Sequence, residues 1–404
     1  MGPAEARQTR RFERKREVIL DAAARLFNTK GLKGTTLADV AQTVDLITTS
    51  LTYYYRRKED LAAACYAQTL ATIGAVAEEA GAGATPQARI EAFCRLYFGM
   101  LAEIARGERA ELVNFYELRA FSGPQREDLL AAYVDLFKSV RRLLAGGANR
   151  LALNARAHLF FSVVLWARTW VRQYEAEDYP RIGERLCDLA LQGLAAPGAI
   201  FAPRRLGIAG NGSAAASEPG PDAFLHAATQ LINEQGYHGA SVERISARLN
   251  VTKGSFYHHL DAKDDLVAEC FERSFATIRR IQHGAAEEGD TGWTRLASAA
   301  AELVLYQLGE EGPLLRYMAL AAAPDSMRDE LGATMQRLTN RFAGVIADGI
   351  ADGSIRAVDP AIAAQLVNGM ANAAADLVQW APGATLENAV DLYARPLFEG
   401  LLAE

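Results

Sequence analysis

A chain of 404 residues is long enough for two or more domains. Half of its residues are apolar and 23% are charged, a composition typical of globular proteins that fold in water. The formal net charge of -6 argues against a protein that coats nucleic acid, but it allows a small basic surface on an acidic body. No apolar run approaches the roughly 18 residues of a membrane span, and the charged N-terminus lacks the apolar core of a signal peptide.

The first sixty residues favour three short helices. We expect residues 1–10 to be disordered, and the first helix then carries an apolar stripe that includes Ile19 and Phe27. Thr35 or Thr36 is the predicted N-cap of the second helix, where its hydroxyl could also contact a phosphate. The third helix is predicted from Thr48 to Tyr55. Its candidate contacts to a nucleic acid, with the Lys that follows, are Thr36, Thr48, Thr49, Thr52, Tyr53, Tyr54 and Lys58.

A second stretch, residues 241–266, has the same organisation. Val242, Ile245 and Leu249 recur at helical spacing, Asn250 suits a tight turn, and Thr252 is a predicted N-cap. The next helix presents small, polar and aromatic side chains with a basic residue near its start, a pattern that suits reading of the DNA major groove. Its candidate contacts, with those flanking it, are Ser241, Lys253, Gly254, Ser255, Tyr257, His258, His259 and Lys263.

The two stretches belong to an internal repeat. With an offset of 205 residues and no gap, fifteen positions between Leu20 and Ile73 carry the same residue in both copies. They include Asn28 and Asn233, Lys58 and Lys263, and Cys65 and Cys270. Ungapped agreement over more than fifty positions indicates two related units in one chain.

Both copies resemble the helix-turn-helix of the TetR family of bacterial transcription regulators. The second copy carries the family's order and spacing in Thr252–Leu260 followed by Lys263, whereas the first has Thr52 in place of the usual Tyr. The resemblance implies an all-α fold with two units, each a three-helix head joined to a helical ligand-binding and dimerisation body. It also implies double-stranded operator DNA and a small apolar or aromatic effector as partners, with no cofactor.

We therefore divide the chain into five segments and expect each to have one role. They are a first DNA-binding head (1–61), a first regulatory body (62–196), a linker (197–220), a second head (221–266) and a second body (267–404). The linker is rich in Pro, Gly and Ser, which predicts flexible chain. By resemblance, the last two helices of each body form a dimerisation bundle, so the two units are expected to pair within one chain, with higher oligomers also open.

The effector is expected in the first body, because residues 62–196 hold fifteen aromatic residues and residues 267–404 only nine. The candidate pocket residues are Tyr97, Phe115, Phe121, Phe137 and Trp166. An aromatic stripe at helical spacing also packs ordinary cores, so both interpretations stand here.

Charge separates the two heads. Residues 1–60 hold twelve Lys and Arg against eight Asp and Glu, whereas residues 222–283 hold seven against eight. The first head is therefore expected to hold DNA mainly through phosphate, and the second to discriminate more by base. The alternative is a scaffold, or a dimer of chains, in which one head no longer binds DNA.

Catalytic and metal sites are not predicted. The four Cys residues form no CxxC pair, the isolated His residues give no metal-binding spacing, and we find no nucleophile, phosphate loop or paired-carboxylate pattern. The expected protein is a cytoplasmic regulator rather than an enzyme.

Overall fold

Helices carry most of the chain, which confirms the all-α prediction. The computed structural model describes residues 3–115, 121, 123–147, 149–209, 221–236, 240–252, 254, 263–323 and 325–403, and in this part the extended pairing is an isolated antiparallel bridge between Ala195 and Ile355. None of the helices within those ranges is long and apolar enough to cross a membrane.

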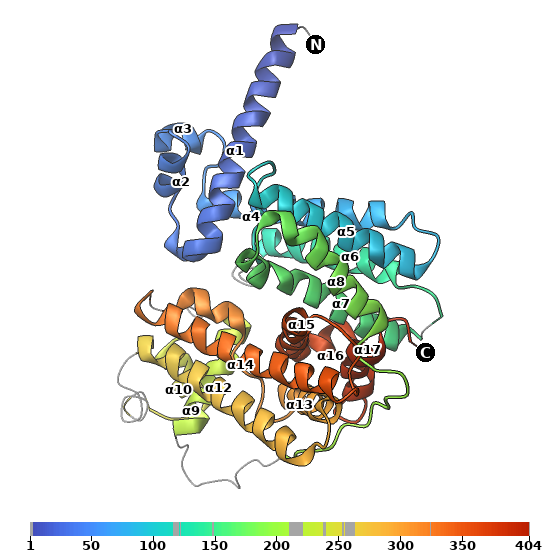
Figure 1. The fold of residues 1–404 in the computed structure, drawn as a ribbon. Coiled ribbons are helices and arrows are strands. Elements are labelled where there is room, and N and C mark those ends of the chain that lie inside the picture. The colour runs from blue at the N-terminus through green and yellow to red at the C-terminus, as the bar shows by residue number, and fades with distance from the viewer. Residues whose placement is uncertain are drawn as a thin grey trace.

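The first unit runs from the protruding blue helix to the green helices in Figure 1. Its main helices are α1 (Pro3–Gly34), α2 (Leu37–Thr43), α3 (Thr48–Thr52), α4 (Lys58–Ala80), α5 (Pro86–Ala105), α6 (Gly123–Leu143), α7 (Arg150–Trp170) and α8 (Tyr179–Gln192). Because α1 begins at Pro3, residues 3–10 are helical, and the expectation of disorder is wrong for them. Near its other end α1 breaks at Gly31, where φ is 70°, a conformation that favours glycine.

The second unit lies below the first in the same view, from yellow to red. Its main helices are α9 (Pro221–Gln235), α10 (Val242–Arg248), α12 (Lys263–Glu288), α13 (Gly292–Leu308), α14 (Asp325–Ala351), α15 (Pro360–Ala373), α16 (Leu377–Trp380) and α17 (Arg395–Glu399). Short 3-10 segments follow α7 (Val171–Gln173 and Ala176–Asp178), and others stand at Tyr317–Ala322 and Ala374–Asp376, while a π-helical turn, η7, covers Val390–Ala394.

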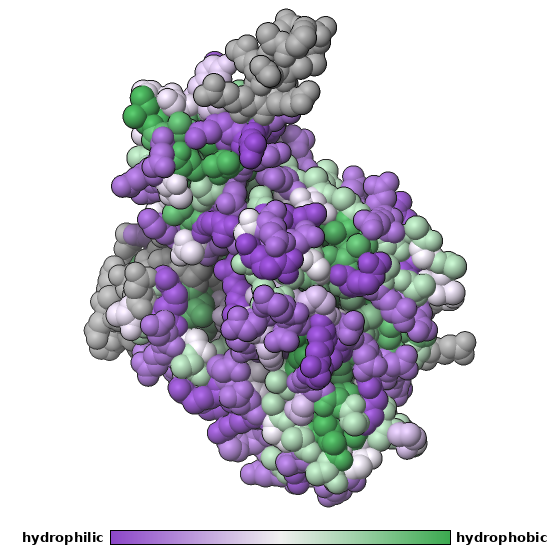
Figure 2. All heavy atoms as spheres, turned by 45° about the horizontal axis from the view of Figure 1, so that its top comes forward, coloured by the Kyte–Doolittle hydropathy of each residue, from purple (hydrophilic) through white to green (hydrophobic). Residues whose placement is uncertain are grey.

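A single buried core extends through the first unit into the second body. It runs from Ile19 in the first head to Leu401 beside α17, whereas the second head packs in a separate cluster that includes Phe224 and Leu338. The two bodies are therefore joined by apolar packing rather than by the connecting chain alone. The outer face shown in Figure 2 is mostly hydrophilic, and its apolar residues form small separate areas.

Helix α7 of the first unit packs against α15 of the second. Trp166 lies over Gly369, where an added Cβ would stand 3.0 Å from the indole. The indole Nε1 donates to Gln365 Oε1 at 3.2 Å. The small residue lets the two helices approach closely, and the hydrogen bond fixes the ring across the junction.

The ends of the two units cross each other. The amide of Leu194 donates to the carbonyl of Phe398 at 2.8 Å, and the amide of Leu401 donates to that of Ala190 at 2.8 Å. At the crossing Gly193 has φ 64° and Gly400 has φ 104°, and a Cβ on either would overlap backbone of the other unit. Both glycines are thus required by conformation and by space.

The connecting segment differs from its prediction. Residues 197–209 are not flexible chain, because Phe201 is 3% exposed and packs between Trp293 and Phe398. The buried carboxylate of Glu302 also accepts the amides of Leu206, Ile208 and Ala209 at 3.3, 2.6 and 2.7 Å. Composition alone concealed these two anchors, and residues 210–220 lie outside the described part.

Candidate nucleic-acid interface

The first head holds its recognition helix by a well-defined turn. Thr36 is the N-cap of α2: its hydroxyl accepts the amide of Asp39 at 3.1 Å, while the Asp39 carboxylate accepts the amide of Thr36 at 2.7 Å. This capping box fixes the start of α2. Asp45, with φ 52°, then reverses the chain before α3.

Helix α3 is shorter than predicted. It covers Thr48–Thr52, and Tyr53 and Tyr54 lie in the turn that follows rather than in an eight-residue helix. Leu51 is fully buried and anchors the helix, whereas Thr48 and Thr49 are exposed. Thr52 is half-buried, and its hydroxyl donates to the carbonyl of Thr49 at 2.9 Å. Two hydroxyls and two methyl groups therefore face outward for a groove.

Two apolar residues that the sequence analysis missed, Ile47 and Phe12, extend this surface. Ile47, the N-cap of α3, is 70% exposed, and the predicted contact residue Tyr53 is 78% exposed. Phe12 of α1 stacks on Tyr54 at 4.8 Å between ring centroids and meets Tyr53 edge-on at 6.1 Å. The aromatic trio of Phe12, Tyr53 and Tyr54 ties the N-terminal helix to the end of α3. The sequence signal for this contact was Phe12, a large apolar side chain within the basic run of α1.

The basic run of α1 has more than one role. Arg16 Nε donates to the hydroxyl of buried Tyr55 at 2.9 Å, and Lys15 Nζ donates to the carbonyl of Val44 at 3.4 Å. These two cations hold the head together. Arg14 is exposed on the same helix, which favours a contact with phosphate there.

The start of α4 carries a cluster of three cations. Arg57 pairs with Asp60 at 2.8 Å, and this hydrogen-bonded pair holds the pKa of the Asp60 carboxyl below its usual range. Gln125 of α6 donates to the same carboxylate at 2.7 Å. Lys58 is the first residue of α4 and is half-buried. The arrangement anchors α4 while it leaves exposed Arg56 at the edge of the head.

The second head repeats the first as far as it is described. Ser241, equivalent to Thr36, caps α10 by accepting the amide of Arg244 at 3.3 Å. Asn250 has φ 57° at the position of Asp45, as its place in a predicted turn requires. Gly254 is exposed in a helical conformation and Lys263 begins α12. The candidates Lys253, Ser255, Tyr257, His258 and His259 lie outside the described residues.

Two cations pair with acids of the second head, one in the head itself and one in the part of α12 that belongs to the second body. Arg248 makes two contacts of 3.1 Å with Glu234, and Arg273 Nε lies 2.8 Å from Asp222. By sequence, residues 1–60 of the first head keep an excess of bases, with twelve Lys and Arg against eight Asp and Glu. The contrast agrees with the charge difference between the heads.

Each head is clamped to its body by the same side chains. Asn28 of α1 donates to the carbonyl of Leu112 at 2.8 Å and accepts the amide of Asn114 at 2.8 Å. Asn233 of α9 does the same with Leu314 at 2.9 Å and Arg316 at 3.0 Å. The middle amide of each segment is held as well. The hydroxyl of Thr69 accepts the amide of Val113, and the hydroxyl of Ser274, at the equivalent position, accepts the amide of Leu315. We call residues 112–114 and 314–316 the two clamp segments.

The five candidate effector residues do not share one cavity among those described. Tyr97 is fully buried between Phe93 and Phe98, and its hydroxyl has no hydrogen-bond partner in the described part. Phe115 and Phe121 both pack on Tyr66. Phe137 lies 4.5 Å from Trp380 of the second unit, and Trp166 meets Tyr317 edge-on at 5.0 Å. Two of the five therefore face the second unit.

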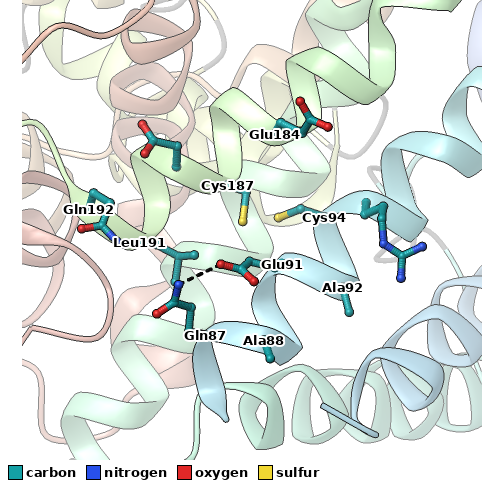
Figure 3. Close-up of a pocket in the computed structure, with 11 residues that line it drawn as sticks. Gln87, Ala88, Glu91, Ala92, Cys94, Glu184, Cys187, Leu191 and Gln192 are labelled. Atoms are coloured by element: carbon teal, nitrogen blue, oxygen red, sulfur yellow. Dashed lines mark hydrogen bonds between the residues drawn. The ribbon is translucent and has the colours of Figure 1, made fainter. Parts of the chain in front are cut away.

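A groove of about 610 Å³ lies between α5 and α8 (Figure 3). The thiols of Cys94 and Cys187 point toward one another across it, and this contact, with burial, raises the pKa of the Cys94 thiol well above its ordinary value. Glu91, Arg95 and Glu184 also line the groove. Such a charged lining suits an apolar effector poorly.

The two repeats match one family model. Residues 19–65 and 224–270 each match the model described as bacterial regulatory proteins, tetR family, with starting points 205 residues apart, as in the repeat. Residues 289–380 match the model of the tetracyclin repressor-like C-terminal domain. The matches confirm the predicted tandem of two such units.

Curated relatives match about a third of this chain. The transcriptional repressor DhaR of Mycobacterium sp. (strain GP1) is 28% identical over 130 residues, which are 32% of this chain and 66% of that protein, just under two thirds. The fatty acid metabolism regulator protein of Bacillus subtilis (strain 168) is 23% identical over 149 residues, 36% of this chain and 76% of that protein. These relatives are named as regulators, not as enzymes.

Solved structures are similar at lower identity. Apo AibR is 22% identical, with a TM-score of 0.36, and covers 43% of this chain and 94% of its own. A TetR-family regulator from Bordetella parapertussis 12822 is 23% identical, with a TM-score of 0.38, and covers 43% of this chain and 92% of its own.

Proposed function

Because the chain belongs to the TetR family of bacterial regulatory proteins, we propose that it is a sequence-specific DNA-binding transcription regulator, a repressor that a small effector releases from its operator. The observation that carries this proposal is the presence of two helix-turn-helix heads of one family in one polypeptide. The two reading heads that such regulators place on DNA are then covalently linked.

The proposed segments are those of the sequence analysis, with 1–61 and 221–266 as heads, 62–196 and 267–404 as bodies, and 197–220 as the connection. We propose further that the two units form an intrachain pseudo-dimer. The contacts between α7 and α15, and the crossed ends at Gly193 and Gly400, support this pairing. An interface on one chain forms at a high effective concentration that does not depend on dilution.

The two heads are proposed to read different half-sites. In the first, Thr48 and Thr49 offer short hydroxyls and methyls, and α1 adds positive charge toward the phosphates. In the second, Lys253 is a candidate for guanine O6 or N7. A mismatch in the half-site of the second head is expected to cost about 1–3 kcal/mol. An operator for this chain is accordingly free of the two-fold symmetry that identical heads impose.

One observation favours a second candidate function. Because Arg248 pairs with Glu234, and residues 222–283 hold seven Lys and Arg against eight Asp and Glu, the second head offers less positive charge to phosphate. The alternative is therefore a regulator or scaffold in which only the first head binds DNA, with two chains needed to occupy a full operator.

Binding to DNA fragments from around its own gene, followed by fluorescence anisotropy between 50 and 200 mM salt, tests the proposal. A regulator binds one fragment tightly, with a log–log salt slope of about -0.9 for each phosphate contacted. Two synthetic palindromes, each doubling one natural half-site, then compare the heads. If both palindromes bind as tightly as the natural operator, the heads are equivalent. Absence of any preferred fragment contradicts sequence-specific function.

A further inference from the structure

Two adjoining cavities lie where the first unit meets the second body. One has a volume of about 140 Å³ and lies between α7 and its 3-10 extension on one side and α14 and α15 on the other. The other, of about 40 Å³, extends toward α12 and α13. Trp166, Tyr317 and Met335 belong to the walls of both. We call the pair the junction cavity.

Both units contribute to its walls. The first unit supplies Trp166, Thr169 and Trp170, and the second supplies Tyr317, Met335 and Gln365 among others. The Trp166 ring is held by Gln365 and by the edge of Tyr317. A molecule bound here would contact both units at once, so its binding energy would depend on how they are docked.

The lining carries no charge. Every described side chain on the walls of either cavity is apolar or a neutral alcohol, amide, indole or phenol. Burial raises the pKa of Tyr317, so its phenol stays neutral. A charged group would lose its hydration without gaining an ionic partner, which is costly. The site therefore selects an uncharged ligand.

One buried donor at the cavity wall has no acceptor. Trp170 is 6% exposed, and its indole Nε1 has no hydrogen-bond partner in the described part of the chain. An unpaired buried N–H is destabilising. Because the Nε1 atom itself has almost no accessible surface, a ligand acceptor reaches it when the Trp170 ring turns toward the cavity, and the new hydrogen bond would then relieve the loss. A cavity of about 150 Å³ can hold a benzene-sized group.

The walls also connect to both head clamps. Leu314, Leu315 and Tyr317 line the cavity, and they belong to or directly follow the clamp segment that Asn233 holds against the second head. On the other side, Arg168 of α7, between Trp166 and Trp170, donates to the carbonyls of Leu112 and Val113 in the first clamp segment. A shift of either wall would reach a head through one clamp.

We propose that the junction cavity is the effector site, and that it binds a small uncharged molecule with an aromatic or branched apolar body and one hydrogen-bond acceptor. This inference rests on the proposed regulatory function. It places the effector between the two units, with Trp166 as the shared wall, rather than inside the first body. Binding biases both heads through the two clamp segments.

Three probes of similar size separate the features of the site. Acetophenone has an aromatic ring and one acceptor, ethylbenzene lacks the acceptor, and benzoate adds a charge. Calorimetric titration of the full chain should give acetophenone the highest affinity, about fivefold above ethylbenzene, and no measurable binding of benzoate. Equal affinity for benzoate and acetophenone contradicts the uncharged site.

Two variants locate the binding. Gly332 lines the larger cavity, and a Cβ there meets only Leu320, at 3.9 Å. Gly332→Leu should fill the space and weaken acetophenone by at least about tenfold. Gly344→Leu is the matched control, because it adds the same side chain to an exposed position of the same helix. Trp170→Phe keeps an aromatic ring but removes the indole N–H, and it should abolish the preference for acetophenone over ethylbenzene. Unchanged binding by Gly332→Leu overturns the location.

Hydrogen exchange tests the coupling. Acetophenone should change amide protection in α1 around Asn28 and in α9 around Asn233, and Gly332→Leu should remove both changes. Changes confined to the cavity walls contradict the coupling. Operator binding is measured separately: a chain that binds operator but no probe refutes this inference alone, and one that binds probe but no DNA refutes the regulatory function alone.

Discussion

Lys58 and Lys263 each begin the helix that follows a recognition helix. We expect both to contact phosphate. Replacing either by Ala should weaken binding to all DNA sequences and reduce the salt slope by about one unit, because one fewer counterion is released. Anisotropy titrations over salt concentration measure both quantities. Lys138→Ala is the control, since Lys138 lies on α6 and pairs with Asp135 at 2.8 Å. No change in affinity or slope for Lys263→Ala would mean that the second head does not hold phosphate there.

His158 is expected to make the junction between the units sensitive to acid. Its Nε2 lies 3.1 Å from the carbonyl of Ala373, and its ring stacks near Tyr393 and Trp380. Burial lowers the pKa of His158 below its usual 6.5, an effect that the Ala373 carbonyl and Asp376 oppose and Arg316 reinforces. Because the unfolded chain takes up a proton below about pH 6.5 and the folded chain resists it, stability falls as pH decreases from there.

Comparison of the wild type with a His158 variant assigns the pH effect to this side chain. Urea unfolding of the wild type and of His158→Gln, at pH 7.5 and 5.5, should show the wild type losing about 1 kcal/mol more than the variant. Gln keeps a hydrogen-bonding side chain but does not titrate. Parallel loss in both proteins would place the acid sensitivity elsewhere.

Local backbone rules predicted single residues well. The cap at Thr36 and the left-handed conformation at Asn250 follow from the chemistry of hydroxyls and Asn at helix starts and turns. Phe12 was not predicted, because its partners Tyr53 and Tyr54 are 41 and 42 residues away and no local pattern records that contact. The exposure of Ile47 was missed for the same reason, since it depends on how α3 docks.

At the scale of elements, the clamps make a further prediction. Asn233→Ala removes two hydrogen bonds and leaves the carbonyl of Leu314 and the amide of Arg316 without that partner, at a cost of about 1–3 kcal/mol in unfolding free energy. It should also reduce the effector-induced loss of DNA affinity, while Asn28→Ala should do so through the first head. Urea unfolding and operator titrations with and without effector measure both effects.

A control variant shows whether the effect of Asn233→Ala is specific to the clamp or follows the loss of any Asn side chain. Asn340→Ala removes an exposed Asn that accepts one hydrogen bond, from Gln336. It should leave both stability and effector response within experimental error. If Asn233→Ala lowers stability but leaves the effector response at wild-type size, the clamp is structural and does not transmit binding.

Helix existence was predictable from periodicity, whereas helix ends and connections were not. Helix α3 stops at Thr52 and not Tyr55, because the chain turns to bury Tyr55 against Arg16. Residues 197–209 look like a linker by composition, yet Phe201 and Glu302 fix them to the second body. Both errors arise from tertiary contacts that a single sequence does not display.

For the whole molecule, the pairing of units within one chain predicts a monomer in solution. Light scattering of the free protein should give a mass near 43.8 kDa at all concentrations. A stable mass near twice that value would favour pairing between chains. A mass that rises with protein concentration would show that the same interface also forms between two chains.

The repeat made the overall organisation predictable, since an offset of 205 residues is visible without a structure. The placement of the candidate effector residues was not. Aromatic counts pointed into the first body, but Phe137 and Trp166 face the second unit. Which surface of a helix meets a partner unit depends on docking, and aromatic composition carries no information about it.

The crossed ends at Gly193 and Gly400 join two units that are made together from one transcript. In an ordinary homodimer, subunits from two alleles mix, and a defective subunit disables the partners it captures. A regulator whose halves are translated as one chain cannot form such hybrids. We expect a defective copy, such as one with a damaged first head, to be recessive when it is expressed beside an intact copy at equal level, and reporter repression in such merodiploid cells measures this. The fusion thus confers a genetic property, freedom from dominant-negative alleles, that follows from the pairing of two units within one polypeptide.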